Sequence, residues 1–156
     1  MKIDFRRPEI SDASWVHEAF EGTDRMCSES CFGNLFMWYE SYDCTIANVD
    51  GVLVCKVKDS YTFPIGGDDD TVFSLLEKFN PPIMHAICPG QKDKIEVRLP
   101  GVYEFTENRD VFDYIYSVSD LANLSGKKYR SKRNHISFFD RTYSWKYKKN
   151  GCFNCS

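Results

Sequence analysis

Two β-rich runs separated by Asp50-Gly51 constrain the fold of this chain more than any other feature. Residues 44–49 and 52–57 are rich in valine, isoleucine, leucine and cysteine. An Asp-Gly pair between such runs is the strongest short hairpin signal, because a type I′ turn needs positive φ at both central residues. The sequence therefore predicts an antiparallel hairpin here. A third β-rich run at 61–65, ended by Gly66-Gly67, extends it to a meander.

Helical spacing of apolar residues alternates with further β-rich runs along the chain. Helices are predicted after Ser11-Asp12, over 28–42 with Ser28 as a cap, and from 68 to 79. Short strands are predicted at 3–5, 83–88, 102–106 and 112–118, with a charged element at 89–99. These mixed elements with a hairpin-rich sheet predict the α+β class, or an α/β mixed sheet.

Net charge is divided unevenly along the chain. The total of −3 combines residues 1–125, with 11 basic and 22 acidic groups, and residues 126–156, with 9 basic and 1 acidic. The length of 156 residues, 42% hydrophobic, fits one globular domain or half of a larger protein. Ample aromatic surface excludes a disordered or collagenous class. The sequence thus predicts an acidic body joined to a basic terminal segment.

The compartment is predicted to be the cytoplasm. The amino terminus lacks the apolar stretch of a secretory signal, and no run approaches the roughly 20 apolar residues of a membrane span. Seven cysteines form an odd set, and reduced thiols are expected in the cytosol. No transmembrane segment is therefore expected.

Two cysteine pairs raise the question of a zinc site. Cys27 and Cys31 are separated by three residues, and Cys152 and Cys155 by two. Zinc takes four soft ligands in a tetrahedron, and local pairs are the usual way to present them. The alternative is unpaired thiols and no metal, which is what we expect because the first spacing is loose and the second pair ends the chain.

Other titratable residues give weaker evidence for a metal-binding or catalytic site. Asp68-Asp69-Asp70 is interpreted as a helix cap rather than a cation site, because consecutive residues of a first turn point in different directions. His17 is expected to be exposed, and His85, in an apolar run, to be a core histidine with a hydrogen-bond partner. A Cys–His pair stays open, since its members need be close only in space, and no nucleophile is named.

A long basic helix is predicted over about 119–141, beginning at the cap pair Ser119-Asp120. One broad face carries apolar residues: Leu121, Leu124, Tyr129, Ile136, Phe139 and Tyr143. The opposite face carries Lys127, Arg130, Arg133 and Asn134. Lys128, Lys132 and His135 project among the apolar positions, where a cation must snorkel, pair with an acid or meet an anion.

Two interpretations of this basic segment remain. In the functional one, Lys128, Lys132 and His135 approach a phosphate-bearing ligand, while Arg130, Arg133 and Asn134 extend the polar, positive surface. In the alternative one, the segment is a solvated basic face with snorkelling lysines. Composition alone favours the alternative one, because runs of charged residues usually lie on the solvated surface.

Specific motifs in this region carry a family resemblance. They are Phe112-Asp113-Tyr114-Ile115-Tyr116, and Leu121-x-x-Leu124-Ser125-Gly126-Lys127-Lys128-Tyr129-x-Ser131-Lys132-Arg133-Asn134-His135-Ile136 with a following Phe. Asp4-Phe5-Arg6, Asn34-Leu35-Phe36 and Phe63-Pro64-Ile65-Gly66 agree with them. Together they resemble a largely uncharacterised bacterial family that is similar to the C-terminal catalytic domain of phosphatidylglycerol lysyltransferase.

The resemblance implies a GNAT-like acyltransferase fold, usually present as a tandem pair. It places one GNAT-like domain at 1–147 and leaves 148–156 as a tail or the start of a second domain. The implied chemistry is attack of an amine or hydroxyl on an acyl or aminoacyl ester. Aminoacyl-tRNA or acyl-CoA is the implied anionic donor, but no cofactor is certain. Coenzyme A lacks support because its Gly-rich phosphate loop is absent.

Three functions follow as hypotheses. The first is an acyl- or aminoacyltransferase that needs a second domain, so that the isolated chain is expected to be inactive. The second is a non-catalytic module whose basic helix binds nucleotide, RNA or an acidic partner. In the third, that helix docks a second GNAT-like domain or a homodimer partner.

Overall fold

The Asp50-Gly51 turn forms as predicted and joins the first two strands of a four-stranded mixed sheet. In the computed structural model, which describes residues 1–21, 23, 27–28 and 30–147, β1 (Cys44–Val49) pairs antiparallel with β2 (Val52–Val57). Asp50 and Gly51 have φ of 53° and 86°. β2 pairs antiparallel with β3 (Ser60–Thr62), which pairs parallel with β4 (Met84–His85). The sheet order is β1-β2-β3-β4.

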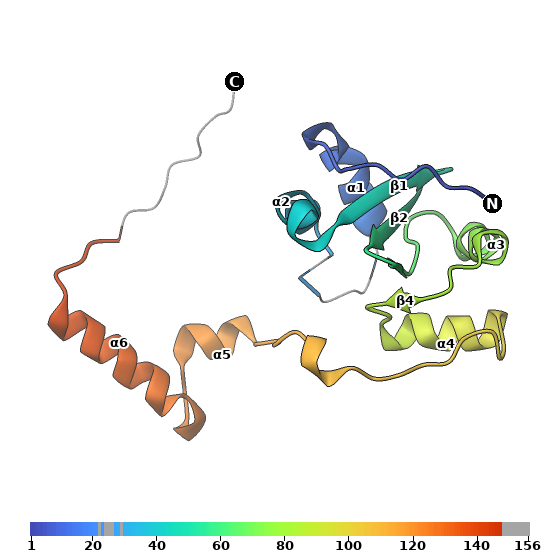
Figure 1. Ribbon diagram of the computed structural model, residues 1–156. Coiled ribbons are helices and arrows are strands. Elements are labelled where there is room, and N and C mark those ends of the chain that lie inside the picture. The colour runs from blue at the N-terminus through green and yellow to red at the C-terminus, as the bar shows by residue number, and fades with distance from the viewer. Residues whose placement is uncertain (22, 24–26, 29, 148–156) are drawn as a thin grey trace. The chain divides into compact units, whose positions relative to one another are not determined.

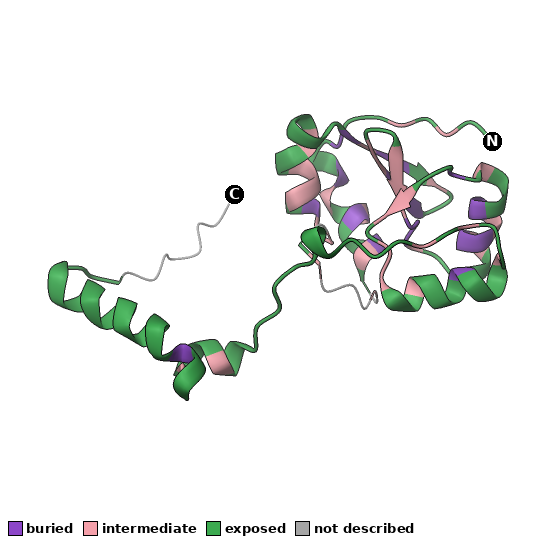
Figure 2. Ribbon diagram, turned by 60° about the horizontal axis from the view of Figure 1, so that its bottom comes forward, coloured by how far each residue is buried: buried purple, intermediate pink, exposed green. Residues whose placement is uncertain are grey.

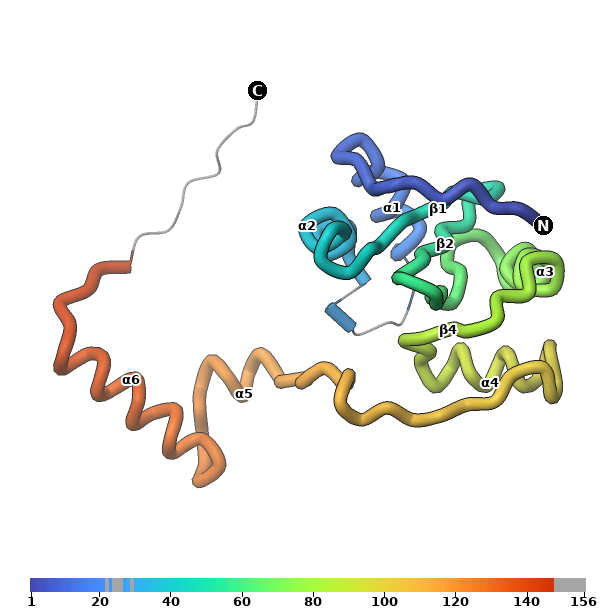
Figure 3. The backbone as a smooth tube through the Cα atoms, viewed as in Figure 1, coloured from blue at the N-terminus to red at the C-terminus, as the bar shows by residue number. Residues whose placement is uncertain are grey.

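The chain divides into two compact units, Met1–Asp113 and Tyr114–Ser156 (Figures 1 and 3). Unit 1 holds the sheet and four α-helices, α1 (Ala13–Phe20), α2 (Phe32–Tyr42), α3 (Asp69–Phe79) and α4 (Pro89–Arg98). It also has short 3₁₀ helices at Ile10–Asp12 and Arg109–Val111. The α+β class with a mixed sheet is confirmed, and it is consistent with a single GNAT-like domain.

The core of unit 1 is built around the hairpin (Figure 2). Each surrounding helix contributes an apolar face, so that burial of side chains from α1, α2, α3 and α4 stabilises the sheet. The fully buried side chains include Val16, Ile46, Val52, Leu53, Val54 and Ile95. Phe73 and Leu76 of α3 lie in the same cluster.

A buried carboxylate fixes the start of the chain. Asp12 is 3% exposed and accepts two hydrogen bonds from the Arg6 guanidinium, at 2.5 and 2.8 Å. It also accepts the Glu9 backbone N–H at 2.7 Å and the Trp15 Nε1–H at 2.8 Å. These donors hold the pKa of Asp12 far below its usual value, chiefly through the bond from Arg6. The backbone of Arg6 in turn pairs with Ile46 of β1.

Two glycines with positive φ offer a matched test of turn geometry. A Cβ at Gly66 (φ 90°) would lie 2.9 Å from the Gly51 carbonyl oxygen, whereas one at Gly51 would meet nothing within 4 Å. We expect Gly51→Ala to lower the free energy of unfolding by about 1 kcal/mol, from backbone strain alone. Gly66→Ala should cost about 2 kcal/mol more, because a backbone atom must move. Equal losses in urea unfolding of the two variants would contradict this.

Unit 2 is described from residue 114 to 147, and its helix is broken where one helix was predicted. α5 (Val118–Asn123) ends at Leu124, whose φ is 47°. A 3₁₀ turn at Lys127–Tyr129 follows Gly126, whose φ is 87°, and α6 (Arg130–Thr142) follows the turn. Left-handed φ at two nearby residues interrupts the α-helical hydrogen bonds, so the single helix over 119–141 is wrong. Its cap is Ser117, not Ser119.

Several other predicted elements are shorter or absent. The strands at 3–5, 102–106 and 112–118 do not form in the described chain, although Arg6 makes a single bridge to β1. The run at 83–88 reduces to β4, and the helix expected from residue 28 begins at Phe32. Alternating apolar residues need a neighbouring strand to become a strand themselves. Tyr103 and Phe105 instead pack their rings against the core from irregular backbone.

Candidate functional site

The basic surface of unit 2 is the candidate site, and one of its lysines pairs with an acid. Lys128 Nζ lies 2.8 Å from Asp120 Oδ2 of α5. The Tyr129 hydroxyl donates to the same oxygen at 3.1 Å, and its ring lies 4.8 Å from Lys128 Nζ. This contact lowers the pKa of Asp120 and raises that of Lys128. Of the three fates that the sequence left open for Lys128, the structure shows pairing with an acid.

Arg133 holds the break between the two helices. Its guanidinium donates to the carbonyl oxygens of Leu124 and Gly126, the second at 2.9 Å. Leu124 is the C-cap of α5, where carbonyl groups lack partners within the helix. A cation there also interacts favourably with the helix dipole. Arg133 therefore positions the basic segment in addition to carrying charge.

Lys132 lies over an aromatic ring. Its Nζ is 5.8 Å from the ring centroid of Tyr116, in the irregular segment before α5. His135, Arg130 and Asn134 are exposed on α6. Thus Lys132 and His135 do not lie among buried apolar groups in the described chain, because α6 is exposed along its whole length (Figure 2).

Positive charge dominates this unit. Residues 114–147 include seven basic side chains, which we call the basic surface: Lys127, Lys128, Arg130, Lys132, Arg133, Arg141 and Lys146. The same residues, 114–147, include only two acidic side chains, Asp120 and Asp140. Asp120 pairs with Lys128, and Asp140 accepts the Trp145 Nε1–H at 2.9 Å. Six cations have no ion pair within the described residues, so the surface is suited to a polyanion.

α6 also presents an apolar face opposite its arginines. Ile136, Phe139 and Tyr143 are between 45% and 55% exposed. The Phe139 ring packs against Tyr143 and Trp145, at centroid distances of 5.1 and 5.9 Å. No other element of the described part of unit 2 covers this face, and an exposed apolar patch of this kind is typical of an interaction surface.

Comparison with protein-family models assigns the chain to a family. The model of the family described as "Phosphatidylglycerol lysyltransferase, C-terminal" matches residues 20–154, which include the whole basic surface. The chain belongs to this family. The resemblance carried by the motifs of residues 110–139 is thereby confirmed.

A solved structure supports the assignment. The lysyltransferase-family chain is 34% identical to a conserved protein of unknown function from Bacteroides thetaiotaomicron VPI-5482, with a TM-score of 0.77. The match covers 91% of this chain and 51% of the other, so this chain spans about half the length of that protein. A search of curated proteins finds no match. Among the described residues, no helix has the length and apolar character needed to cross a bilayer.

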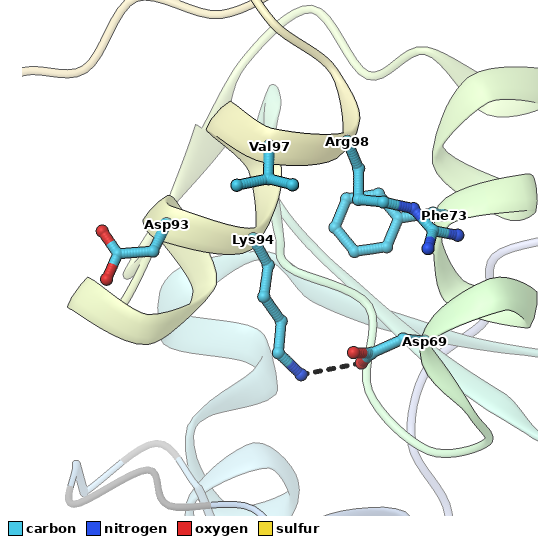
Figure 4. A pocket seen from close by; sticks show the side chains of 6 residues that line it. All are labelled: Asp69, Phe73, Asp93, Lys94, Val97 and Arg98. Atoms are coloured by element: carbon cyan, nitrogen blue, oxygen red, sulfur yellow. Dashed lines mark hydrogen bonds and ion pairs between the residues drawn. The ribbon is translucent and has the colours of Figure 1, made fainter.

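A shallow pocket of about 300 Å³ lies between α3 and α4 of this family member (Figure 4). Lys94 Nζ reaches Asp69 Oδ1 at 2.8 Å, and Arg98 pairs with Asp70 while lying over the Phe73 ring. The lysine and the arginine are therefore already neutralised by α3. The sequence predicts the charged element at 89–99 but not this pocket, because the pairing of α4 with Asp69 and Asp70 of α3 is a tertiary contact.

The predicted cap interpretation of the aspartates is confirmed beside this pocket. Asp68 Oδ1 accepts the Thr71 backbone N–H at 2.8 Å, which lowers the pKa of Asp68. Asp69 and Asp70 form the ion pairs with α4. The three carboxylates thus point to different partners, and the described residues contain no cluster of three or more metal-ligating side chains.

Cysteines and histidines of the family member have ordinary surroundings. Cys27 Sγ lies 2.9 Å from Ser30 Oγ, and Cys31 Sγ bonds the Ser28 carbonyl. Cys152 and Cys155, the other half of the zinc hypothesis, lie outside the described residues. His17 is exposed, as expected. His85 has the expected hydrogen-bond partner, with its Nδ1 2.7 Å from Ser60 Oγ, but it is half-buried and lies outside the core.

Burial suppresses ionisation of the Cys44 thiol. Cys44 begins β1 and lines a second pocket of about 240 Å³ with Arg7, Tyr39 and Glu40. Desolvation raises the pKa of the Cys44 thiol to about 11. The thiolate, which is the nucleophilic form, is therefore scarce at neutral pH.

Proposed function

We propose that this chain is the first GNAT-like domain of a phosphatidylglycerol lysyltransferase-like acyl- or aminoacyltransferase. In this proposal, the domain covers residues 1–147 and its basic surface binds an anionic donor such as aminoacyl-tRNA. The observation that supports it is that the family match includes the six cations of unit 2 that have no ion pair in the described chain. Transfer itself is assigned to the chain together with a second domain.

Phosphate neutralisation is the physical basis of the donor site. Lys127, Arg130 and Lys132 are exposed at the break and on the first turn of α6, close together along the chain. Cations in this arrangement displace counterions from a nucleic acid backbone, which favours binding at low salt. A free amino acid carries no phosphate and a lipid headgroup carries few, so a nucleic acid donor is favoured.

Binding of aminoacyl-tRNA at increasing salt tests the proposal. We expect the logarithm of the association constant to fall linearly with the logarithm of salt concentration, with a slope of about −2 to −4. Fluorescence anisotropy with labelled tRNA measures it. Absence of binding, or binding that does not respond to salt, would reject the donor site, and turnover with a second domain would test transfer separately.

Asp120 is expected to compete with the donor for Lys128. Asp120→Asn removes the carboxylate that holds Lys128 Nζ at 2.8 Å, while retaining an acceptor for Tyr129. We expect tRNA affinity to rise about threefold to tenfold and the salt slope to become steeper by about one. The measurement is the same anisotropy titration.

Asp140→Asn is the matched control for this prediction. It removes the same charge from the same unit, but Asp140 bonds Trp145 and has no cation partner in the described chain. A smaller gain in tRNA affinity for Asp140→Asn than for Asp120→Asn would show that the effect comes from freeing Lys128. Equal gains, or a gain that persists when Lys128 is replaced by glutamine, would attribute the effect to net charge alone.

The apolar face of α6 favours a second candidate function, that of a docking module. Ile136, Phe139 and Tyr143 are half exposed, which is unusual for three neighbouring apolar residues on one helix face. A partner domain or a second copy of the chain would bury them. A dimer whose interface includes α6, together with no affinity for RNA, would support this candidate over the first.

A further inference from the structure

The pair formed by Tyr116 and Lys132 has the two groups needed to hold a nucleotide. The Tyr116 side chain is 51% exposed and precedes α5, while Lys132 comes from the first turn of α6. The lysine Nζ lies 5.8 Å from the ring centroid. The break between α5 and α6 at Leu124 and Gly126 changes the direction of the chain, so that the first turn of α6 lies beside the segment before α5.

Neither group is committed to a strong contact within the described chain. Lys132 has no ion pair there, in contrast to Lys128, whose carboxylate partner is Asp120. A cation over an exposed ring is attracted weakly, since water screens the interaction. A ligand that offers both a π-face and a phosphate therefore replaces the internal contact with two better ones.

An unpaired nucleotide has this combination. Its base is free to stack on an aromatic ring, and its phosphate lies within reach of a nearby ammonium group. In a duplex, the bases are already stacked on one another and their faces are not accessible. Tyr116 therefore distinguishes unpaired from paired RNA, whereas Lys132 attracts both through their phosphates.

We infer that Tyr116 and Lys132 form a binding site for one unpaired nucleotide of RNA, with the base on the Tyr116 ring and the phosphate on the Lys132 ammonium. This rests on the proposed function, which supplies RNA as the ligand of the basic surface. It adds a chemical selectivity that phosphate neutralisation lacks, because cations alone do not distinguish single-stranded from double-stranded RNA.

Anisotropy titrations with two labelled RNAs test the site. One is a short unpaired oligoribonucleotide, and the other is a blunt duplex with the same number of phosphates. Tyr116→Leu should weaken binding of the unpaired RNA about fivefold or more, the loss expected for one stacked base, and leave duplex binding within about twofold. Tyr116→Phe retains the ring and should bind like the wild type.

Two further variants test the phosphate contact of Lys132 and the specificity of the Tyr116 effect. Lys132→Gln should reduce the salt slope for both RNAs by about one, because it removes one phosphate contact. Tyr147→Leu removes another exposed tyrosine of the same unit, 78% exposed, and should change neither affinity. Circular dichroism of each variant shows whether the helices of unit 2 are retained.

The outcomes separate this inference from the proposal on which it rests. If the wild type binds neither RNA, the donor site itself is rejected and the nucleotide site with it. If both RNAs bind but Tyr116→Leu affects neither, or weakens both equally, the donor site stands and the nucleotide site is overturned. Selective loss of unpaired RNA, reversed in Tyr116→Phe, supports it.

Discussion

Replacing Asp12 by alanine is expected to lower the free energy of unfolding by about 3 kcal/mol. The carboxylate is 3% exposed and accepts hydrogen bonds from Arg6, Trp15 and the Glu9 backbone. Without it, the Trp15 and Glu9 donors lose their acceptor in a partly buried position. We use the low end of the range for buried pairs, because the Arg6 side chain is 52% exposed and water screens its charge. Urea unfolding measures the loss.

Asp4→Ala is the matched control, since Asp4 is an exposed carboxylate of the same segment. Its replacement should change stability by less than about 0.5 kcal/mol. A loss below about 1 kcal/mol for Asp12→Ala would show that the network contributes little, and that the Arg6–Ile46 bridge alone fixes the chain start.

The lowered pKa of Asp12 also predicts how the free energy of unfolding depends on pH. Because the folded state holds the pKa of Asp12 below its ordinary value of 3.8, the unfolded chain binds this proton more tightly. The stabilisation is therefore fully present above about pH 5 and is lost as the pH falls below 4 toward the folded pKa. The stability difference between the wild type and Asp12→Asn should shrink over that range. A difference that is constant with pH would contradict the assignment.

Local signals in the sequence predicted the parts of the fold that local chemistry determines. The hairpin follows from positive φ at Asp50 and Gly51, and the α3 cap from the acceptor oxygen of Asp68. The runs at 102–106 and 112–118 were predicted wrongly, because β-propensity cannot show whether a neighbouring strand is present. The role of Asp12 was missed for a similar reason. Its position before an apolar helical run indicates a cap, whereas its partner Arg6 is set by the pairing of the chain start with β1.

The candidate site was predictable in composition but not in geometry. The excess of lysine and arginine after residue 125 is visible in the sequence, and it identifies the basic surface. The prediction from helical periodicity treated residues 119–141 as one continuous helix. In such a helix, Lys128 and Lys132 lie among apolar positions. The positive φ of Leu124 breaks that helix, although leucine gives no local signal for it. The break creates the contacts of Lys128 with Asp120 and of Lys132 with Tyr116.

Removing three exposed cations at once should weaken RNA binding more than any single substitution described above. In the triple variant Lys127→Gln, Arg130→Gln and Lys132→Gln, we expect tRNA affinity at low salt to fall by about tenfold or more, and the salt slope to decrease by about two to three. Arg133 is left in place because it bonds two backbone carbonyls at the helix break, so its loss would change the structure as well as the charge. Anisotropy titrations over a range of salt concentrations measure both quantities.

A second triple variant tells whether location or net charge causes the loss. Lys2, Lys58 and Lys78 are exposed lysines of unit 1, and replacing all three by glutamine changes the net charge of the chain by the same amount. Local neutralisation of phosphates requires that this variant retain most of the affinity and the full salt slope, because an exposed charge contributes little to phosphates that lie more than about 10 Å from it at ordinary salt. Equal losses in the two triple variants would mean that tRNA is attracted by the charge of the whole chain, and the basic surface would then have no claim to be the donor site.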